Sequence, residues 1–284
     1  MNNSILQRFD LGGRTVIITG GGGELCGAMA DALGAMGVKV AVLDISLEKA
    51  EIRAQAVIRS GGTARAFKCN VLESVELREC REAISAVWGT PDLLINGAGG
   101  NDPRGSTSVE FEEPEPRAGA TAQSFFDLDP AGFRHVFDLN FMGTFLATQV
   151  FSRGMVEKGR GSIVNISSMS AFMPLTKVAA YSAAKAAVSN FTRWLAVHFS
   201  HAGVRVNALA PGFFMTEQLR FLHIDPKTGE LLPRARQVIA HTPMGRYGLP
   251  DDLIGALVWL LSDASGFVTG VVVPVDGGFS SYSI

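Results

Sequence analysis

Two side chains four residues apart, Tyr181 and Lys185, could together transfer a proton. They lie in a helical stretch, so they face the same way one turn apart. A free phenol has a pKa near 10 and is a poor base at neutral pH, but a neighbouring ammonium favours the phenolate and brings its pKa toward the range of a general acid/base. Ser168, thirteen residues before Tyr181, could bind a substrate oxygen where charge develops. Without other motifs, this spacing would indicate a buried tyrosine beside a surface-reaching lysine.

A glycine-rich turn offers a second chemistry, the binding of phosphate groups. Strand-like residues 15–19 run into four glycines at 20–23, and a helical pattern opens at about Leu25. Such a turn lets backbone amides approach a pyrophosphate at a helix amino terminus. The next strand-like run ends in Asp44, which can accept hydrogen bonds from both hydroxyls of an adenosine ribose. Because Asp44 would repel a 2′-phosphate and no Arg or Lys occupies 20–24, the sequence favours NAD over NADP.

These side chains need a scaffold, and strand-like runs alternate with helical patterns along the chain. Runs rich in β-branched residues, typical of strands buried on both faces, occur at 15–19, 38–43, 64–69, 92–96, 162–167, 204–208 and 271–275. Helical periodicity covers 25–37, 46–60, 72–88, 130–156, 178–201 and 250–262. The alternation predicts an α/β fold: a doubly wound Rossmann domain with a parallel seven-stranded sheet and helices on both faces. The ligand should lie beyond the carboxyl ends of the strands.

Two segments interrupt this alternation, at about 100–124 and 213–246. The first is polar and contains three prolines. Long segments without regular structure are uncommon inside compact domains and often form lids or binding loops. Within the second segment, we expect about 213–242 to be a mobile lid over the substrate. Neither a repeat nor a linker divides the chain, so residues 1–284 are expected to form a single domain.

Composition narrows the class of protein. With 47% hydrophobic and 18% charged residues, the composition excludes a disordered protein. The net charge of −2 lacks the positive excess that binding to nucleic acid or to an anionic membrane would favour. Three cysteines are too few for a disulfide scaffold, and His198 and His201 lack a third ligand, so we expect no metal. Because a signal-peptide pattern and a bilayer-length apolar stretch are both missing, we expect a cytoplasmic protein that binds a small molecule.

In their order along the chain, these motifs resemble those of the short-chain dehydrogenase/reductase family. The resemblance extends from about Leu11 to the end. Four further motifs carry it: Asn96-Gly-Ala-Gly99, similar to the family's NNAG; Asn140 in LNFMGTFL; Pro211-Gly212 with Thr216; and VDGG ending at Gly278. It implies an oxidoreductase that moves a hydride between NAD and a secondary alcohol carbon.

The resemblance also implies roles for particular residues. Tyr181 would exchange the proton, Ser168 would bind the reacting oxygen, Lys185 would hold the nicotinamide ribose and tune the phenol, and Asn140 would support a proton-relay water. Tyr181 and Lys185 would also contact the cofactor. The other cofactor contacts would come from Thr19, Gly20, Gly22, Gly23, Leu25, Asp44, Asn70, Val71, Asn96, Ala98, Gly99, Pro211, Gly212, Phe214 and Thr216. A homotetramer assembled through the helices bearing Asn140 and Tyr181 is implied as well.

The chain departs from the family pattern in three places. In the TGxxxGxG turn, Glu24 and Cys26 occupy the second and third glycine positions. Cys26 is small enough for close helix–strand packing, whereas a carboxylate at Glu24 would weaken pyrophosphate binding unless it turns away. Asn70 stands where the family commonly has an Asp that meets the adenine amine, and Gly97 replaces the second Asn of NNAG. These departures bear on cofactor affinity rather than on the fold.

Within the family, the chain most resembles the sugar-acid branch, whose members interconvert D-mannonate and D-fructuronate. The stretches NGAGGNDP, PGFFMTEQ and HTPMGRYG carry this finer resemblance. Besides touching Ser168 and Tyr181, such a substrate needs a cation for its carboxylate. The candidates that we consider in the irregular segments are Arg104, Lys177, Arg220, His223 and Arg236. Arg104 and Arg220 rank ahead of Lys177 because a guanidinium binds a carboxylate with two parallel hydrogen bonds.

Two alternatives remain open at this point. The first is a gluconate 5-dehydrogenase, or another polyol or keto-acid reductase, with the same four catalytic residues. The second is a binding protein that senses a nucleotide, because a fold does not fix a function. The presence of all four catalytic residues argues against a sensor, which need not keep them.

Overall fold

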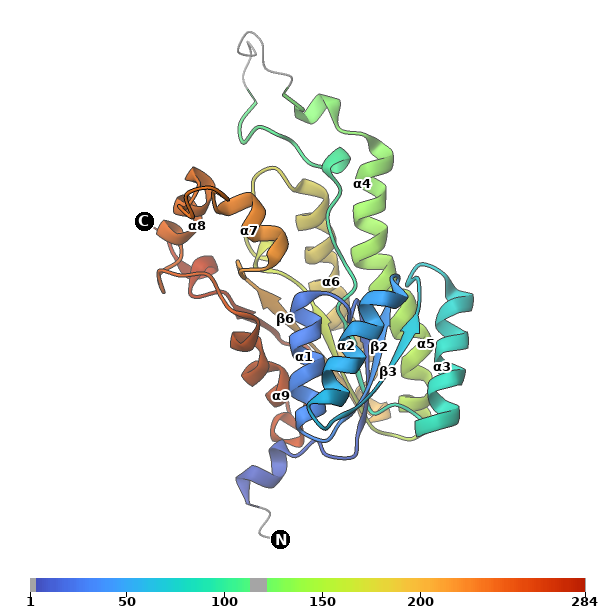
Figure 1. Cartoon of the computed structure of the whole chain (residues 1–284). Helices are drawn as coiled ribbons and strands as arrows, with labels where there is room; N and C mark the ends of the chain where they lie inside the picture. Colours follow the sequence, from blue (N-terminus) through green and yellow to red (C-terminus); the bar gives the residue numbers. More distant parts are fainter. Residues whose placement is uncertain (1–3, 113–121, 284) are drawn as a thin grey trace.

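A single parallel sheet forms the centre of the molecule in the computed structural model, which describes residues 4–112 and 122–283 (Figure 1). Its order is β3-β2-β1-β4-β5-β6-β7. The strands are β1 (Thr15–Thr19), β2 (Lys39–Asp44), β3 (Thr63–Lys68), β4 (Leu93–Asn96), β5 (Gly161–Ile166), β6 (Val204–Pro211) and β7 (Val272–Val275). All paired strands are parallel, which confirms the predicted doubly wound α/β fold. The strand order reverses between β1 and β4, where such sheets bind their ligands.

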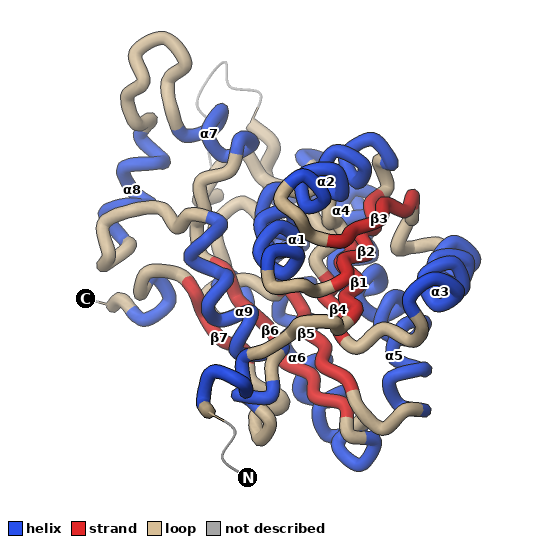
Figure 2. Tube along the Cα trace, turned by 60° about the horizontal axis from the view of Figure 1, so that its bottom comes forward, coloured by secondary structure: helices blue, strands red, loops and turns tan. Residues whose placement is uncertain are grey.

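Helices cover both faces of the sheet, as predicted (Figure 2). One face carries α1 (Glu24–Ala35), α2 (Leu47–Arg59) and α9 (Ile254–Leu261), and the other carries α3 (Ser74–Trp88), α5 (Gly143–Glu157) and α6 (Ala179–His198). Successive side chains of a strand point to opposite faces. Val16 and Ile18 of β1 therefore pack toward α1 and α9, whereas Ile17 packs toward α3 and α5.

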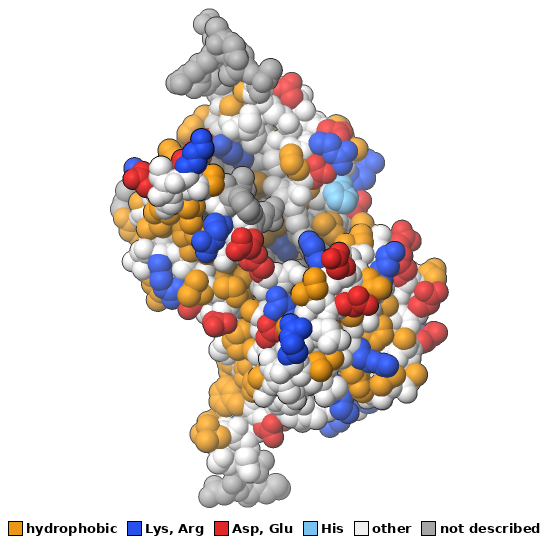
Figure 3. Space-filling view, in the orientation of Figure 1, with side chains coloured by type: hydrophobic (Ala, Val, Ile, Leu, Met, Phe, Trp, Pro, Cys, Tyr) orange, Lys and Arg blue, Asp and Glu red, His pale blue; other side chains and the backbone are white. Residues whose placement is uncertain are grey.

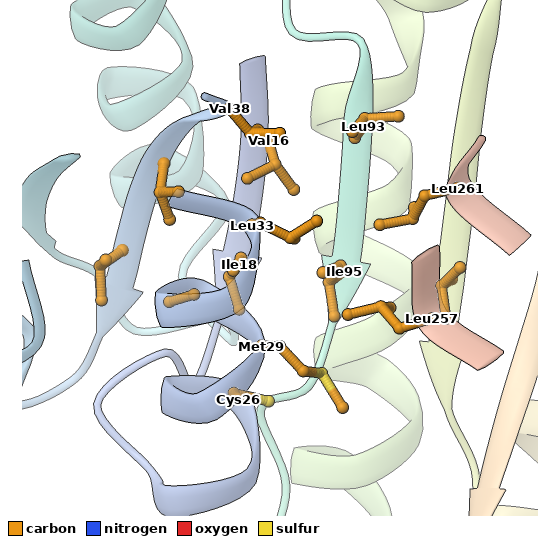
Figure 4. Close-up of a cluster of buried hydrophobic side chains, with 14 of the residues drawn as sticks. Val16, Ile18, Cys26, Met29, Leu33, Val38, Leu93, Ile95, Leu257 and Leu261 are labelled. Carbon is orange, nitrogen blue, oxygen red and sulfur yellow. The ribbon is translucent and has the colours of Figure 1, made fainter. Parts of the chain in front are cut away.

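The core between α1 and the sheet fixes the turn that precedes this helix (Figure 4). Met29 and Leu33 lie one helical turn apart and are fully buried against β1 and β4. Burial of one such side chain contributes about 1.5–3 kcal/mol. Cys26, one turn earlier on the same face, is also buried and brings the start of α1 close to the ends of both strands.

The predicted helix over 130–156 is interrupted where Asn140 lies. It consists of α4 (Pro130–Phe137), a π-helical turn (Asp138–Met142) and α5. Such turns are rare and often mark functional sites. Similarly, the predicted helix over 250–262 begins with a 3-10 turn (Pro250–Leu253) before α9.

Segment 213–246 is more regular than expected, because it contains α7 (Glu217–His223) and α8 (Pro233–His241). The Thr216 hydroxyl caps α7 by accepting a hydrogen bond from the Leu219 amide. Ala235 and Val238 of α8 form a small apolar core with Tyr247. Residues 213–247 are therefore called the small lobe. Its predicted mobility stays a prediction.

The other irregular segment, 100–124, includes a 3-10 turn at Pro103–Gly105, while 113–121 lie outside the described residues. Across residues 4–112 and 122–283, every helix is too short or too polar to cross a membrane.

Candidate active site

A cavity of about 920 Å³ opens at the carboxyl ends of β1, β2, β3 and β4, where the strand order reverses. The surface is hollowed between the small lobe and the part of the molecule that carries α4 (Figure 3). Many of the predicted cofactor residues line the cavity: Gly20, Gly22, Gly23, Leu25, Asp44, Asn70, Val71, Ala98, Gly99 and Thr216. The structure thus brings together residues from five separate parts of the sequence.

The glycine turn is tied to both neighbouring strand ends. Gly20 has φ +65°, and a Cβ added there would lie 2.8 Å from the Ala98 Cα, so glycine is required. The Thr19 hydroxyl accepts hydrogen bonds from the amides of Gly97 (3.1 Å) and Ala98 (3.2 Å). Thr19 is itself buried, and its hydroxyl fixes the positions of two residues that line the cavity, Gly97 and Ala98.

Asp44, the last residue of β2, also lines the cavity. One carboxylate oxygen accepts a hydrogen bond from the Gly22 amide (3.1 Å), and the other accepts one from the Ser46 amide (3.0 Å). Both oxygens retain lone pairs for further donors. The glycine cradle and this fixed carboxylate fit the pyrophosphate and ribose of a dinucleotide.

Two of the departures from the family pattern compensate each other. A Cβ added to Gly97 would lie 2.1 Å from the Cys26 Sγ, so the missing side chain at 97 leaves the space that the thiol fills. Burial raises the pKa of the Cys26 thiol to about 12. Cys26 is consequently a neutral packing group at physiological pH, and the close approach of α1 to the loop after β4 is preserved.

Glu24, the other departure in the glycine turn, is turned toward the small lobe. Its two carboxylate oxygens accept hydrogen bonds from the Glu217 amide at 2.8 and 3.0 Å. The charge is thereby held at the first turn of α7, where a carboxylate is favourable. Glu24 thus links the glycine turn to the small lobe.

The two asparagines named as cofactor residues have different surroundings. Asn70 lines the cavity, and its side-chain oxygen accepts a hydrogen bond from the Leu72 amide (3.1 Å). Asn96 is buried, and its amide donates to Thr148 Oγ1 and Asn165 Oδ1, both at 2.8 Å. Asn96 therefore fixes the end of β4 from inside the fold rather than from the cavity wall.

The residues after β6 also differ in their placement. Thr216 lines the cavity. Gly212 packs against Asp276 too closely for a side chain, and Phe214 is buried against Gly248. Together with Pro211, the last residue of β6, these residues lie outside the lining of the large cavity. They carry the chain from the sheet into the small lobe.

The predicted catalytic groups converge from three elements. Ser168 follows β5, and its side chain lies near that of Tyr181 on α6. The Lys185 ammonium donates to the Ile166 carbonyl oxygen (2.8 Å) and lies 5.5 Å from the centre of the Tyr181 ring. A Cβ added to Gly99 would lie 2.5 Å from Asn140 Oδ1 and 3.4 Å from Lys185 Nζ. Asn140 and Lys185 therefore both border the backbone of Gly99.

The π-helical turn anchors Asn140. Its side-chain amide donates to the carbonyl oxygens of Gly100 (2.7 Å) and Val136 (2.8 Å), and its Oδ1 accepts from the Gly100 amide (3.3 Å). Its own backbone carbonyl accepts a hydrogen bond from the Thr144 hydroxyl (2.9 Å). This fully buried asparagine locks the loop after β4 to the helix pair α4–α5.

The protonation of the pair differs from the expectation of a lowered phenol pKa. Burial raises the pKa of Tyr181, and its hydrogen bond with Ser168 only partly offsets this effect. Burial also lowers the pKa of Lys185 to about 8, because a desolvated ammonium loses its proton more readily. Tyr181 is therefore protonated at neutral pH, the state that can donate a proton to a carbonyl oxygen.

The cations proposed for the substrate carboxylate are not equally available. Arg104 is held by Asp102 (2.7 Å) and lies 3.6 Å from Asp129, so carboxylates of its own surroundings occupy its guanidinium. Arg220 and Arg236 are exposed, 58% and 67%, on the small lobe. Of the two arginines ranked ahead of Lys177, Arg104 is therefore the less available one.

Lys177 and His223 differ from these arginines. Lys177 is half-buried just before α6 and adopts φ +74°, which is unusual for a residue other than glycine. His223 is buried, and its Nδ1 lies 2.6 Å from the Tyr247 hydroxyl. The histidine therefore has a partner inside the small lobe.

Two basic residues on the cavity wall, Lys49 and Arg53, were missed from the sequence. The sequence prediction considered only residues 20–24 as a source of positive charge near the ribose. Lys49 and Arg53 lie further along, on α2, and Arg53 is paired with Asp31. Their positions after the Ser46 cap could have pointed to this wall. In the part of the chain that the structure describes, His, Cys, Asp and Glu form no cluster of three suited to a metal.

Known proteins share this architecture over nearly the whole chain. The family model described as "Enoyl-(Acyl carrier protein) reductase" matches residues 25–280. The "Uncharacterized oxidoreductase UxuB" of Bacillus subtilis is 50% identical, with 96% of this chain and 97% of that protein covered. The 5-keto-D-gluconate 5-reductase of Escherichia coli K12 is 33% identical, with 95% and 96% covered.

A solved structure gives the same result in three dimensions. It is named a "putative D-Mannonate oxidoreductase" from Haemophilus influenza and contains bound NAD. It is 48% identical to this chain, superposes with a TM-score of 0.92, and the match covers 96% of this chain and 97% of that one. These matches, together with the glycine turn and Asp44, show that the chain belongs to the short-chain dehydrogenase/reductase family and is an NAD(P)-dependent oxidoreductase.

Proposed function

We propose that this enzyme uses NAD to interconvert D-mannonate and D-fructuronate. The observation that carries the proposal is the placement of Asn140 and Lys185 against Gly99, which lines the same cavity as Asp44. Lys185 lies 5.5 Å from the centre of the Tyr181 ring and so links Tyr181 to this cavity. The 48% identity to the NAD-containing Haemophilus protein supports the choice of this sugar acid. A second candidate is the reduction of a keto-gluconate, supported by the similarity to the Escherichia coli reductase.

Bound NAD would supply or accept the hydride, and the chain would supply orientation and the proton. The residues that would hold the cofactor are Gly20, Gly22, Gly23, Asp44, Asn70 and Thr216. In the direction of reduction, the Tyr181 hydroxyl donates its proton to the carbonyl oxygen of the substrate while Ser168 donates a hydrogen bond to the same oxygen. The buried Lys185, with its pKa of about 8, is poised to return a proton to the site.

The choice of NAD over NADP follows from the charge at the ribose. The Asp44 carboxylate is fixed by two backbone amides and would repel a 2′-phosphate. Lys49 adds a positive charge to the same cavity, but the Asp44 carboxylate is the group that accepts a hydrogen bond from the glycine turn. We therefore assign NAD as the cofactor.

A homotetramer is part of the proposal. Trp194 of α6 stacks between Phe191 and His198, with ring centroids 6.1 and 4.6 Å away. Trp194 is 56% exposed and Val197 is 76% exposed. A second copy of α6 would remove this apolar surface from water.

A substrate comparison with the purified protein tests the proposal. NADH formation is measured with D-mannonate, D-gluconate and a panel of polyols, and the keto product is identified by mass spectrometry. The proposal predicts the largest kcat/KM for D-mannonate. A larger value for D-gluconate would replace the substrate with the second candidate, and no turnover of any sugar acid would overturn both.

A further inference from the structure

Two loops that are far apart in the sequence meet the helix α8 at the guanidinium of Arg234. Its Nη1 pairs with Glu110 Oε1 at 2.5 Å, and its Nη2 donates to the Thr176 hydroxyl at 3.2 Å. Glu110 lies in the segment that follows β4, and Thr176 lies in the loop that leads into α6. Arg234 therefore joins the small lobe to the segment after β4 and to the loop before α6, the helix that carries Tyr181.

The loop that Arg234 contacts is attached to the start of the catalytic helix. The Leu175 amide donates to the Ser182 hydroxyl (3.4 Å), and Ser182 is next to Tyr181. The Lys177 carbonyl oxygen accepts a hydrogen bond from the Thr107 amide (2.9 Å), which brings the segment after β4 to the same place. Arg234, Glu110 and Thr176 thus connect the small lobe to the start of α6. A separate contact, between Glu24 and the Glu217 amide, connects α7 of the small lobe to the glycine turn.

The environment of Arg234 leaves room for an exchange of partners. Its side chain is 35% exposed and that of Glu110 is 29% exposed, so water or a ligand can reach the pair. Among the hydrogen bonds of residues 4–112 and 122–283, Arg234 Nε takes part in none. A guanidinium has five donors, of which Glu110 and Thr176 use two.

We propose that Arg234 binds the carboxylate of the substrate and that Glu110 occupies this position in the ligand-free enzyme. The side chain of Glu110 ends in the same chemical group as a sugar acid, so one carboxylate can replace the other on the guanidinium. Thr176 keeps the guanidinium plane oriented during the exchange. Arg234 is thus a specificity-determining residue. This inference rests on the proposed function, because it requires an anionic substrate.

A simpler interpretation is that the Arg234–Glu110 ion pair only stabilises the contact between the small lobe and the segment after β4. Partly exposed ion pairs often stabilise a fold by less than about 1 kcal/mol. The two interpretations differ in what they predict for Glu110. If Glu110 only stabilises this contact, its loss disturbs the site and weakens the binding of every substrate. As a competitor, Glu110 opposes the binding of acids, and its loss strengthens the binding of acids alone.

The experiment compares Glu110→Gln, Arg234→Ala and Arg234→Lys with the wild-type enzyme on D-mannonate and on the uncharged D-mannitol, at saturating NAD. We expect Arg234→Ala to raise the KM for D-mannonate at least tenfold and to change the KM for D-mannitol less than twofold. Glu110→Gln should lower the KM for D-mannonate about threefold or more. Arg234→Lys should fall between Arg234→Ala and the wild type, because an ammonium keeps the charge but loses the two parallel hydrogen bonds.

Lys227→Ala is the control, since Lys227 is an exposed cation of the same small lobe. It should leave both KM values unchanged. The inference is overturned if Glu110→Gln raises the KM for D-mannonate, or if Arg234→Ala impairs both substrates equally. If the wild-type enzyme itself does not favour the acid over the hexitol, the proposed function fails first. NADH binding, followed by its fluorescence, verifies that each variant retains a folded cofactor site.

Discussion

The cofactor side of the site and its substrate side are built in different ways. The cofactor side consists of strand ends and the turns after them, fixed by short contacts such as that between Gly20 and Ala98. The substrate side consists of irregular segments that side chains hold together, as Arg234 does for Glu110 and Thr176. The first is set by the backbone of the sheet, whereas the second depends on a few replaceable polar contacts. This division lets one scaffold keep its cofactor while the substrate changes.

The largest effect should come from the residue that serves both sides. Tyr181→Phe removes the proton donor and little volume, so it should lower kcat by about 10²–10⁴-fold while NADH affinity stays nearly constant. Steady-state kinetics and NADH fluorescence measure the two quantities. Tyr282→Phe, at a partly exposed tyrosine of the carboxyl-terminal segment, is the control and should retain activity. Near-normal turnover by Tyr181→Phe would remove Tyr181 from its role.

On the cofactor side, Asp44→Ala should shift the preference from NAD toward NADP by tenfold or more. The variant loses a repulsive charge and charge-assisted hydrogen bonds, which contribute about 1.5–3 kcal/mol. Lys49, on the same wall, should strengthen the shift. The ratio of kcat/KM values for the two cofactors measures it. A wild-type preference for NADP would contradict the assigned role of Asp44.

The contact between Cys26 and Gly97 can be tested as a pair. Gly97→Ala places a methyl group against the Cys26 sulfur, and such overpacking costs about 1–3 kcal/mol. In a Cys26→Ala background the same change should cost less than half as much, because the sulfur is gone. Urea unfolding of the four proteins in the cycle measures the coupling. Additive effects would show that the two departures are independent.

A fourth effect concerns stability at alkaline pH rather than activity. The pKa of Lys185 is about 8 in the folded protein and has an ordinary value of 10.5, so between these values the unfolded chain binds more protons. The Lys185 contribution to the free energy of unfolding therefore rises with pH through this window. Lys185→Met should remove this rise when its pH profile is subtracted from that of the wild type. Parallel profiles would contradict a strongly desolvated lysine.

The sheet and the cofactor side could be predicted because they leave regular patterns in the sequence. The bounds of β1 were predicted without error, and most cofactor residues directly follow a strand. Burial on both faces demands runs of apolar residues, and a tight turn demands glycine at Gly20. Patterns of this kind are local, so a single sequence reveals them.

The substrate side could not be predicted because its contacts join residues that are far apart and do not recur at a regular spacing along the sequence. Arg234 and Glu110 are 124 residues apart, and Glu24 meets the Glu217 amide 193 residues away. The helix α7 has seven residues, too few for a clear amphipathic pattern. The raised pKa of Tyr181 was also missed, because the spacing to Lys185 shows a neighbouring charge but not the burial that outweighs it.

The most direct test of the account is the ratio of kcat/KM for D-mannonate to that for D-mannitol, with NAD as the cofactor. The two substrates share their carbon skeleton and differ in the carboxylate. If the substrate side holds a cation for this group, the acid should be preferred by at least tenfold, a difference of about 1.4 kcal/mol. Equal values would contradict the sugar-acid assignment and leave a general secondary-alcohol dehydrogenase.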